Sequence, residues 1–100
     1  MILHINTKDQ KQVRVSLKRD GEVVKELSEE NEYGSQVLLP LIEKILKKNE
    51  LDYKDLEGIE VETGPGSFTG LKVGASVANA LGFSLAIPVN GKKIETELKY

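Results

Sequence analysis

Hydrophobic and polar residues alternate with the two-residue period of β-strands along the first third of the chain. Met1 to Thr7 is a short apolar segment, and Gln12 to Lys18 places valine and leucine at every second position. Asp20-Gly21 favours the positive φ angles of a type I′ turn, which joins antiparallel strands. Glu22 to Leu27 is therefore predicted as the returning strand of a hairpin.

Between Tyr33 and Asn49 the hydrophobic period becomes helical. Ser35 is a candidate N-cap for this helix, and two lysines lie favourably in its last turn. If the helix began at Ser35, Pro40 would lie beyond the first turn and remove a backbone donor. We therefore expect either a slight kink or a helix start nearer Pro40.

Shorter elements follow in the second half of the chain. The sequence predicts a capped helical turn over Asp52 to Leu56, a strand over Gly58 to Thr63, a break over Gly64 to Gly70, a helix over Leu71 to Leu81 ended by Gly82, and a strand over Ser84 to Ile87. The predicted order is strand, strand, strand, helix, strand, helix, strand.

A hairpin meander followed by two strand-helix crossovers predicts an α/β fold with a mixed five-stranded sheet. Right-handed crossovers place both helices on one face of that sheet. The opposite face is predicted to meet water, because polar side chains occupy it: Arg14, Ser16, Lys18, Glu60 and Glu62. We expect one domain over residues 1–90 and a polar tail over residues 91–100.

Composition narrows the possible chemistry. The 100 residues carry a net charge of −2, no cysteine and one histidine. Disulfides, thiolate catalysis and a His/Cys zinc site are thereby excluded, and the basic excess typical of direct nucleic-acid binding is missing. The apolar run at the N-terminus is too short for a signal peptide or a membrane span. We expect a cytoplasmic protein with no metal, no membrane contact and only indirect contact with nucleic acid.

Three groups of residues could nevertheless carry chemistry. His4 is the single histidine. Nothing in the sequence spacing places Ser67 or Thr69 as a nucleophile beside it, so His4 is interpreted as structural. An acidic cluster before the first helix could bind a cation but more often favours the helix N-terminus; it comprises Glu29, Glu30 and Glu32. The loop between the fourth strand and the second helix is rich in glycine and consists of Gly64, Pro65, Gly66, Ser67, Phe68, Thr69 and Gly70.

That glycine-rich loop has two interpretations. Its amides and the helix dipole could receive a phosphate, although the loop lacks the endings of a P-loop, a dinucleotide fingerprint or a nucleophile elbow. Alternatively, the glycines permit a tight turn and Ser67 or Thr69 caps the helix.

The helices themselves suggest an interaction surface. Apolar residues of the first helix span about 200°, nearly twice the ~100° stripe needed to cover a sheet, so one stripe is expected to lack a partner inside the domain. In the second helix, Gly70, Gly74 and Ala78 lie on one line and allow close backbone approach.

Three segments resemble the TsaB (YeaZ) family: Ile2 to Thr7, Val37 to Ile42 and above all Gly64 to Gly74. The resemblance covers residues 1 to about 90 and implies the N-terminal ribonuclease-H-like domain of the actin/Hsp70/sugar-kinase superfamily. It also implies a noncatalytic subunit, without a cofactor, that supports a TsaD-like transferase and a TsaE-like ATPase in threonylcarbamoyladenosine (t6A) modification of tRNA. Such proteins are also expected to form homodimers.

Carried onto this chain, the resemblance implies a partner surface on both helices. Its residues are Leu38, Leu39, Ile42, Leu46, Lys72, Ser76, Asn79, Ala80 and Phe83. Two departures from the family weaken a catalytic interpretation: the second domain is missing from the sequence, and Asn6 stands where an aspartate is usual. Two alternatives remain, a nucleotide- or phosphate-binding domain that uses Gly64 to Gly70 and a purely structural homodimer. A peptidase is the least favoured function.

Overall fold

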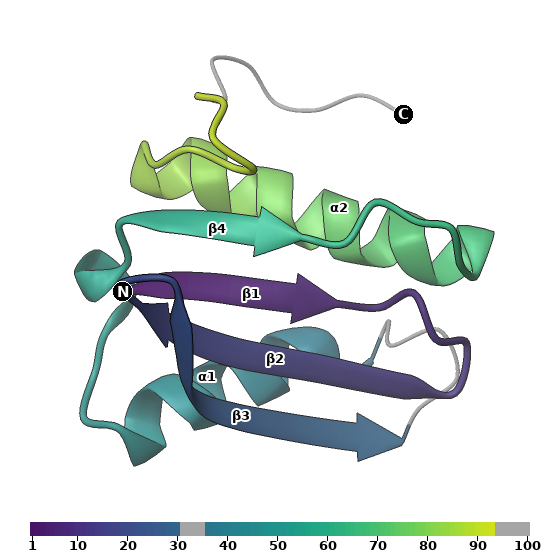
Figure 1. Ribbon diagram of the computed structural model, residues 1–100, viewed down its shortest axis with the longest axis horizontal. Helices are drawn as coiled ribbons and strands as arrows, with labels where there is room; N and C mark the ends of the chain where they lie inside the picture. Colours follow the sequence, from purple (N-terminus) through teal and green to yellow (C-terminus); the bar gives the residue numbers. More distant parts are fainter. Residues whose placement is uncertain (31–35, 94–100) are drawn as a thin grey trace.

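A computed structural model of the protein describes residues 1–30 and 36–93 (Figure 1). Its elements are β1 (Ile2–Asn6), β2 (Gln12–Arg19), β3 (Glu22–Glu30), α1 (Leu38–Lys48), the 3₁₀ turn η1 (Tyr53–Asp55), β4 (Gly58–Val61) and α2 (Phe68–Leu85). The strands form a four-stranded sheet in the order β3-β2-β1-β4. β1 pairs antiparallel with β2 and parallel with β4, so the sheet is mixed, as predicted.

The predicted hairpin is confirmed. β2 and β3 pair antiparallel, and Asp20 and Gly21 at the turn have φ angles of 53° and 81°. An irregularity in register between Leu17 and Lys18 adds one residue to β3 opposite them. Both strands are longer than the sequence pattern indicated.

The core lies on one face of the sheet. Leu3 and Ile5 of β1, Val15 of β2 and Ile59 of β4 are almost fully buried there, in one cluster with apolar residues of both helices. α1 contacts β2 and β3, whereas α2 contacts β4 and β1. The prediction of two helices on one face therefore agrees with this packing.

Helix α1 corrects the expectation of an unused apolar stripe. All five of its buried apolar residues belong to the core cluster: Leu38, Leu41, Ile42, Ile45 and Leu46. Partly buried Leu51 and Tyr53 pack against that cluster as well, so nearly all of the wide arc is covered within the chain, and Leu39 remains 47% exposed. The helix begins at Leu38, which places Pro40 in the first turn, where its missing N–H costs nothing. Ser35, proposed as the N-cap, lies outside the described residues.

The fifth strand is the second correction. α2 continues through Gly82 to Leu85, and Ala86 takes the left-handed C-cap conformation at φ 56°. Ser84 and Leu85 are therefore helical, and the prediction of a strand over Ser84 to Ile87 was wrong. A single residue, Val89, forms a parallel bridge with Ile59 instead. Of the predicted tail, residues 94–100 lie outside the described part of the chain.

Candidate functional site

The glycine-rich loop joins the end of β4 to the first turn of α2. Gly64 has a φ of 114°, which favours glycine. Ser67 is the N-cap of α2, and its Oγ accepts a hydrogen bond of 3.2 Å from the Gly70 amide. The Ser67 amide donates to the Lys8 carbonyl at 2.8 Å. The predicted capping role of Ser67 is confirmed.

Three glycines allow this loop and α2 to approach the chain that follows β1. A Cβ on Gly66 would lie 2.6 Å from the Lys8 Cβ, and one on Gly70 or Gly74 would overlap the Thr7 carbonyl oxygen or Thr7 Oγ1. Thr7 is 1% exposed, and its hydroxyl donates to the Gly70 carbonyl at 2.6 Å. Close packing therefore explains these glycines without a ligand. Two amides that could have received a phosphate, those of Ser67 and Gly70, already have partners.

The proposed partner surface divides into a buried and an exposed set. Leu38, Ile42 and Leu46 are at most 2% exposed and belong to the core, so they offer a partner no surface on this chain. Leu39 and Phe83 are 47% and 45% exposed. The polar or small members Lys72, Ser76 and Ala80 are exposed, and Asn79 is partly buried.

Of the exposed set, Leu39, Ser76 and Ala80 line one shallow apolar depression of about 260 Å³. It joins α1 to α2 and is lined by Leu39, Ser76, Val77, Ala80, Leu81 and Ser84. Ser76, Ala80 and Ser84 recur at a spacing of four residues and so share one helix face. Ser84 is absent from the predicted surface because the sequence pattern predicts a strand at that position. Phe68 was noted only as part of the glycine-rich loop, yet it is 75% exposed, with the Lys72 ammonium 5.5 Å from its ring centre.

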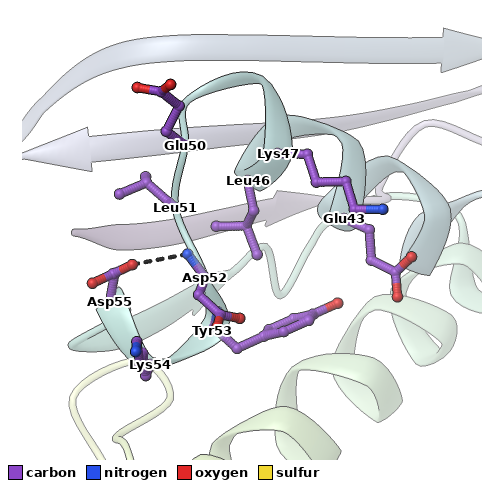
Figure 2. A pocket seen from close by; sticks show the side chains of 9 residues that line it. All are labelled: Glu43, Leu46, Lys47, Glu50, Leu51, Asp52, Tyr53, Lys54 and Asp55. Atoms are coloured by element: carbon purple, nitrogen blue, oxygen red, sulfur yellow. Dashed lines mark hydrogen bonds between the residues drawn. The ribbon is translucent and has the colours of Figure 1, made fainter.

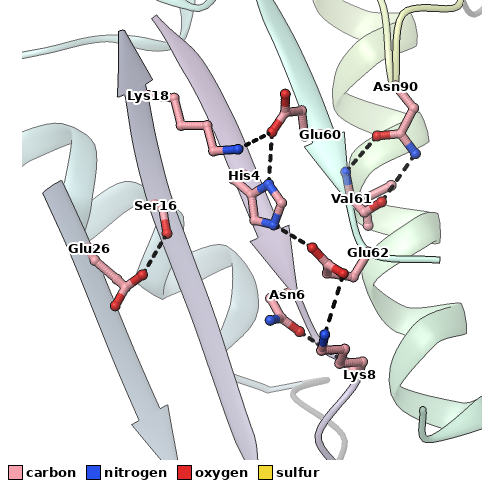
Figure 3. Close-up of polar contacts among 10 residues, drawn as sticks. All are labelled: His4, Asn6, Lys8, Ser16, Lys18, Glu26, Glu60, Val61, Glu62 and Asn90. Carbon is pink, nitrogen blue, oxygen red and sulfur yellow. Dashed lines mark hydrogen bonds and ion pairs between the residues drawn. The ribbon is translucent and has the colours of Figure 1, made fainter. Parts of the chain in front are cut away.

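The face of the sheet opposite the helices carries a polar network (Figure 3). His4 Nδ1 lies 2.9 Å from Glu60 Oε1, and its Nε2 lies 2.8 Å from Glu62 Oε2. Lys18 Nζ donates to the same Glu60 oxygen at 2.8 Å. These hydrogen bonds from Lys18 and then His4 lower the pKa of Glu60. A neutral imidazole has one N–H, so only the protonated ring can donate to both carboxylates.

This network gives His4 the structural role expected from the sequence, since it joins β1 to two carboxylates at β4. The predicted polar face is also present, with one difference. Ser16 is only 3% exposed, and its hydroxyl donates to Glu26 at 3.1 Å. Among residues 1–30 and 36–93, no group of three or more His, Asp or Glu side chains is arranged to hold a metal ion.

A larger cavity of about 560 Å³ lies where α1 ends and η1 begins (Figure 2). Its walls include Leu46, Leu51 and the Tyr53 ring. Burial, followed by the nearby Glu43 and Asp52 carboxylates, raises the pKa of the Tyr53 hydroxyl. Asp52 and Asp55 form a reciprocal capping box for η1, so their carboxylates stabilise the turn and do not form a free acid-base pair.

Comparison with known proteins places this geometry in a family. The family model described as "TsaD: tRNA N6-adenosine threonylcarbamoyltransferase" matches residues 10–91. The tRNA threonylcarbamoyladenosine biosynthesis protein TsaB of Buchnera aphidicola subsp. Acyrthosiphon pisum is 38% identical over 52 residues, which are 52% of this chain and 24% of that protein. The tRNA N6-adenosine threonylcarbamoyltransferase of Nitrosospira multiformis is 45% identical over 71 residues, 71% of this chain and 20% of that protein.

A solved structure supports the same placement. YeaZ from Pseudomonas aeruginosa superposes with a TM-score of 0.74 at 27% identity, covering 88% of this chain and 41% of that one. The chain thus spans about a quarter or less of the curated relatives described above and less than half of this structure.

The mixed sheet, the two helices on one of its faces and the glycine-rich strand-helix junction define a domain of the YeaZ kind. The chain belongs to the TsaD family, and its resemblance to TsaB and YeaZ is confirmed by the relatives of those names. Within residues 1–30 and 36–93, the structure contains no helix that is both long and apolar enough to span a membrane.

Proposed function

We propose that this chain is a noncatalytic partner subunit for a TsaD-like transferase in t6A biosynthesis. The proposal includes a TsaE-like ATPase as a further partner, a homodimer when the chain is alone, indirect contact with tRNA and a cytoplasmic location. Its support comes from the family membership and from relatives named for t6A biosynthesis.

One observation carries the proposal: the exposed Leu39 of α1 and small residues of α2 meet at the α1–α2 depression. Leu39, and Phe83 exposed elsewhere on α2, are large enough to serve as anchors at an interface. The small side chains of Ser76, Ala80 and Ser84 let another helix approach closely, since interhelical distances of about 8–10 Å depend on the side chains at the contact. A helix pair docked there could bury on the order of 800 Å² per partner, which is typical of specific interfaces.

The ends of β1 and β4 support the noncatalytic part of the proposal. Asn6 is a neutral amide whose Oδ1 accepts a hydrogen bond from the Lys8 amide at 3.1 Å. It lacks the carboxylate charge that magnesium favours. The adjacent glycines are explained by packing against Thr7 and Lys8.

Calorimetric titration of the chain with the TsaD-like protein from the same genome tests the proposal. Ala80→Arg places a long charged side chain in the depression and should weaken binding at least tenfold. Val23→Arg is the matched control, because Val23 of β3 is 52% exposed and does not line the depression, and binding should be unchanged. Equal affinity of the parent and Ala80→Arg would contradict the proposed surface.

The nucleotide-binding alternative can be tested on the same sample. Titration with ATP and magnesium should give no binding heat if the loop is structural. Saturable heat that disappears in Ser67→Ala would favour a phosphate site at Gly64 to Gly70 over the proposed role.

A further inference from the structure

The chain reverses direction directly after it pairs with β4. Val89 bridges Ile59 in parallel, and Lys92 then bridges back to Val89 in the antiparallel sense. Between them, Asn90 and Gly91 have φ angles of 50° and 79°, which is the signature of a type I′ turn. The Val89 and Lys92 amides each donate to the other residue's carbonyl, at 2.8 and 3.0 Å. Residues 89–92 thus form a tight hairpin at the edge of the sheet.

The side chain of Asn90 takes the place of a strand's peptide group at this edge. Its Oδ1 accepts from the Val61 amide at 2.9 Å, and its Nδ2 donates to the Val61 carbonyl at 3.1 Å (Figure 3). The Asn90 amide also donates to the Ile59 carbonyl at 2.8 Å. We call these three hydrogen bonds to β4 the Asn90 latch.

An asparagine followed by glycine can lose its side-chain amide without an enzyme. The Gly91 backbone nitrogen attacks Asn90 Cγ and gives up its proton, the bond from Cγ to Nδ2 breaks, and ammonia leaves a cyclic succinimide. Water then opens the ring at either carbonyl and yields aspartate or isoaspartate. Glycine favours the attack because it has no side chain to obstruct its nitrogen, and water is the only co-reactant.

We propose that Asn90 is a site of spontaneous deamidation that the latch restrains and that, once converted, no longer closes the latch. Val61 holds both ends of the side-chain amide. The side chain must therefore leave β4 before Cγ can meet the Gly91 nitrogen, and the reaction proceeds from the open latch.

Conversion removes the donor that the latch needs. In aspartate, a carboxylate oxygen replaces Nδ2 and faces the Val61 carbonyl, so two acceptors meet with no proton between them. Isoaspartate also adds a backbone atom inside a turn that has room for two residues. Both products leave the edge of β4 open at Val61.

Peptide mapping by mass spectrometry tests the restraint. The full chain is incubated in mildly alkaline buffer, folded or in guanidinium chloride, and amide loss is followed at three asparagines. Conversion of Asn90 should be at least about tenfold slower in the folded chain, as expected from hydrogen bonds of ordinary net strength. Asn49 and Asn79, which precede glutamate and alanine, should convert far more slowly than Asn90 in the unfolded chain. Equal rates of Asn90 deamidation in the folded and unfolded chain would overturn the claim that the latch restrains the reaction.

Hydrogen exchange tests the consequence of conversion. Asn90→Asp should lower the protection of the backbone amide at position 90 at least about tenfold while leaving the Leu3 and Leu17 backbone amides unchanged. Asn49→Asp is the matched control, because it also removes an amide that donates to a backbone carbonyl, that of Ile45 at 2.7 Å, and the latch should be unaffected. Full protection of the backbone amide at position 90 in the Asn90→Asp variant would overturn the claim that the product cannot close the latch.

Discussion

Thr7 Oγ1 donates a hydrogen bond of 2.6 Å to the carbonyl oxygen of Gly70. This contact joins the end of β1 to the first turn of α2, the longer of the two helices that line the proposed partner surface. It requires glycine at positions 70 and 74, because a Cβ at either position would overlap Thr7. The most distinctive segment of the sequence therefore positions a helix.

Gly74→Ala should destabilise the fold by about 1–3 kcal/mol, the usual cost of adding a methyl group where there is no space. Thr7→Ala relieves the overlap, so the double variant should lose less stability than the two single losses combined. Urea unfolding of the four proteins measures this coupling. If the stability losses of the two single variants simply add in the double variant, the Thr7 side chain is not the reason that position 74 needs glycine.

Glu60 should make the stability of the sheet depend on acid pH. Because its pKa is lower in the folded state than the ordinary 4.5, the ionised carboxylate stabilises the fold above that value. The contribution is lost as the pH falls through the folded-state pKa. Since the side chain is 43% exposed, we expect Glu60→Gln to cost only about 0.5 kcal/mol at neutral pH and nothing in strong acid.

Urea unfolding of the parent and Glu60→Gln over a range of pH measures this difference. Glu22→Gln, on the exposed strand β3, is the control for removing one negative charge. A difference between parent and Glu60→Gln that stays constant into strong acid would contradict the ion-paired role of Glu60.

Two residues of α1 that the resemblance assigned to one surface should behave differently. Ile42 is 0% exposed, so Ile42→Ala should cost about 2–5 kcal/mol of folding stability. Leu39 is 47% exposed, and Leu39→Ala should change stability by about 0.5 kcal/mol or less while weakening partner binding. Thermal unfolding and calorimetry separate the two effects. A small loss of stability in Ile42→Ala would contradict its assignment to the core.

Local signals in the sequence predicted the hairpin, the cap at Ser67 and the polar sheet face, because turn chemistry and alternation depend on neighbouring residues. The prediction of an unused apolar stripe on α1 was wrong for a different reason. Helical periodicity shows how wide an apolar arc is, but not how many elements cover it, and here the sheet and the segment after the helix cover nearly all of it.

The end of α2 shows a second limit. Gly82 was interpreted as a helix terminator, but it is buried within α2, and Ala86 adopts the left-handed cap four residues later. Tertiary packing therefore overrode the local preference of glycine. By contrast, the signal for the last turn is present in Asn90-Gly91, a strong hairpin dipeptide, although the predicted boundary between domain and tail falls between these two residues.

Light scattering on a sizing column, over a range of concentrations, tests the central claim most directly. The parent chain and Ser76→Arg are run alone and then mixed with the TsaD-like protein from the same genome. We expect the parent to be a homodimer that converts to a heterodimer, and Ser76→Arg to stay monomeric in both runs. A parent that remains monomeric and does not bind that protein would contradict a partner role carried by α1 and α2.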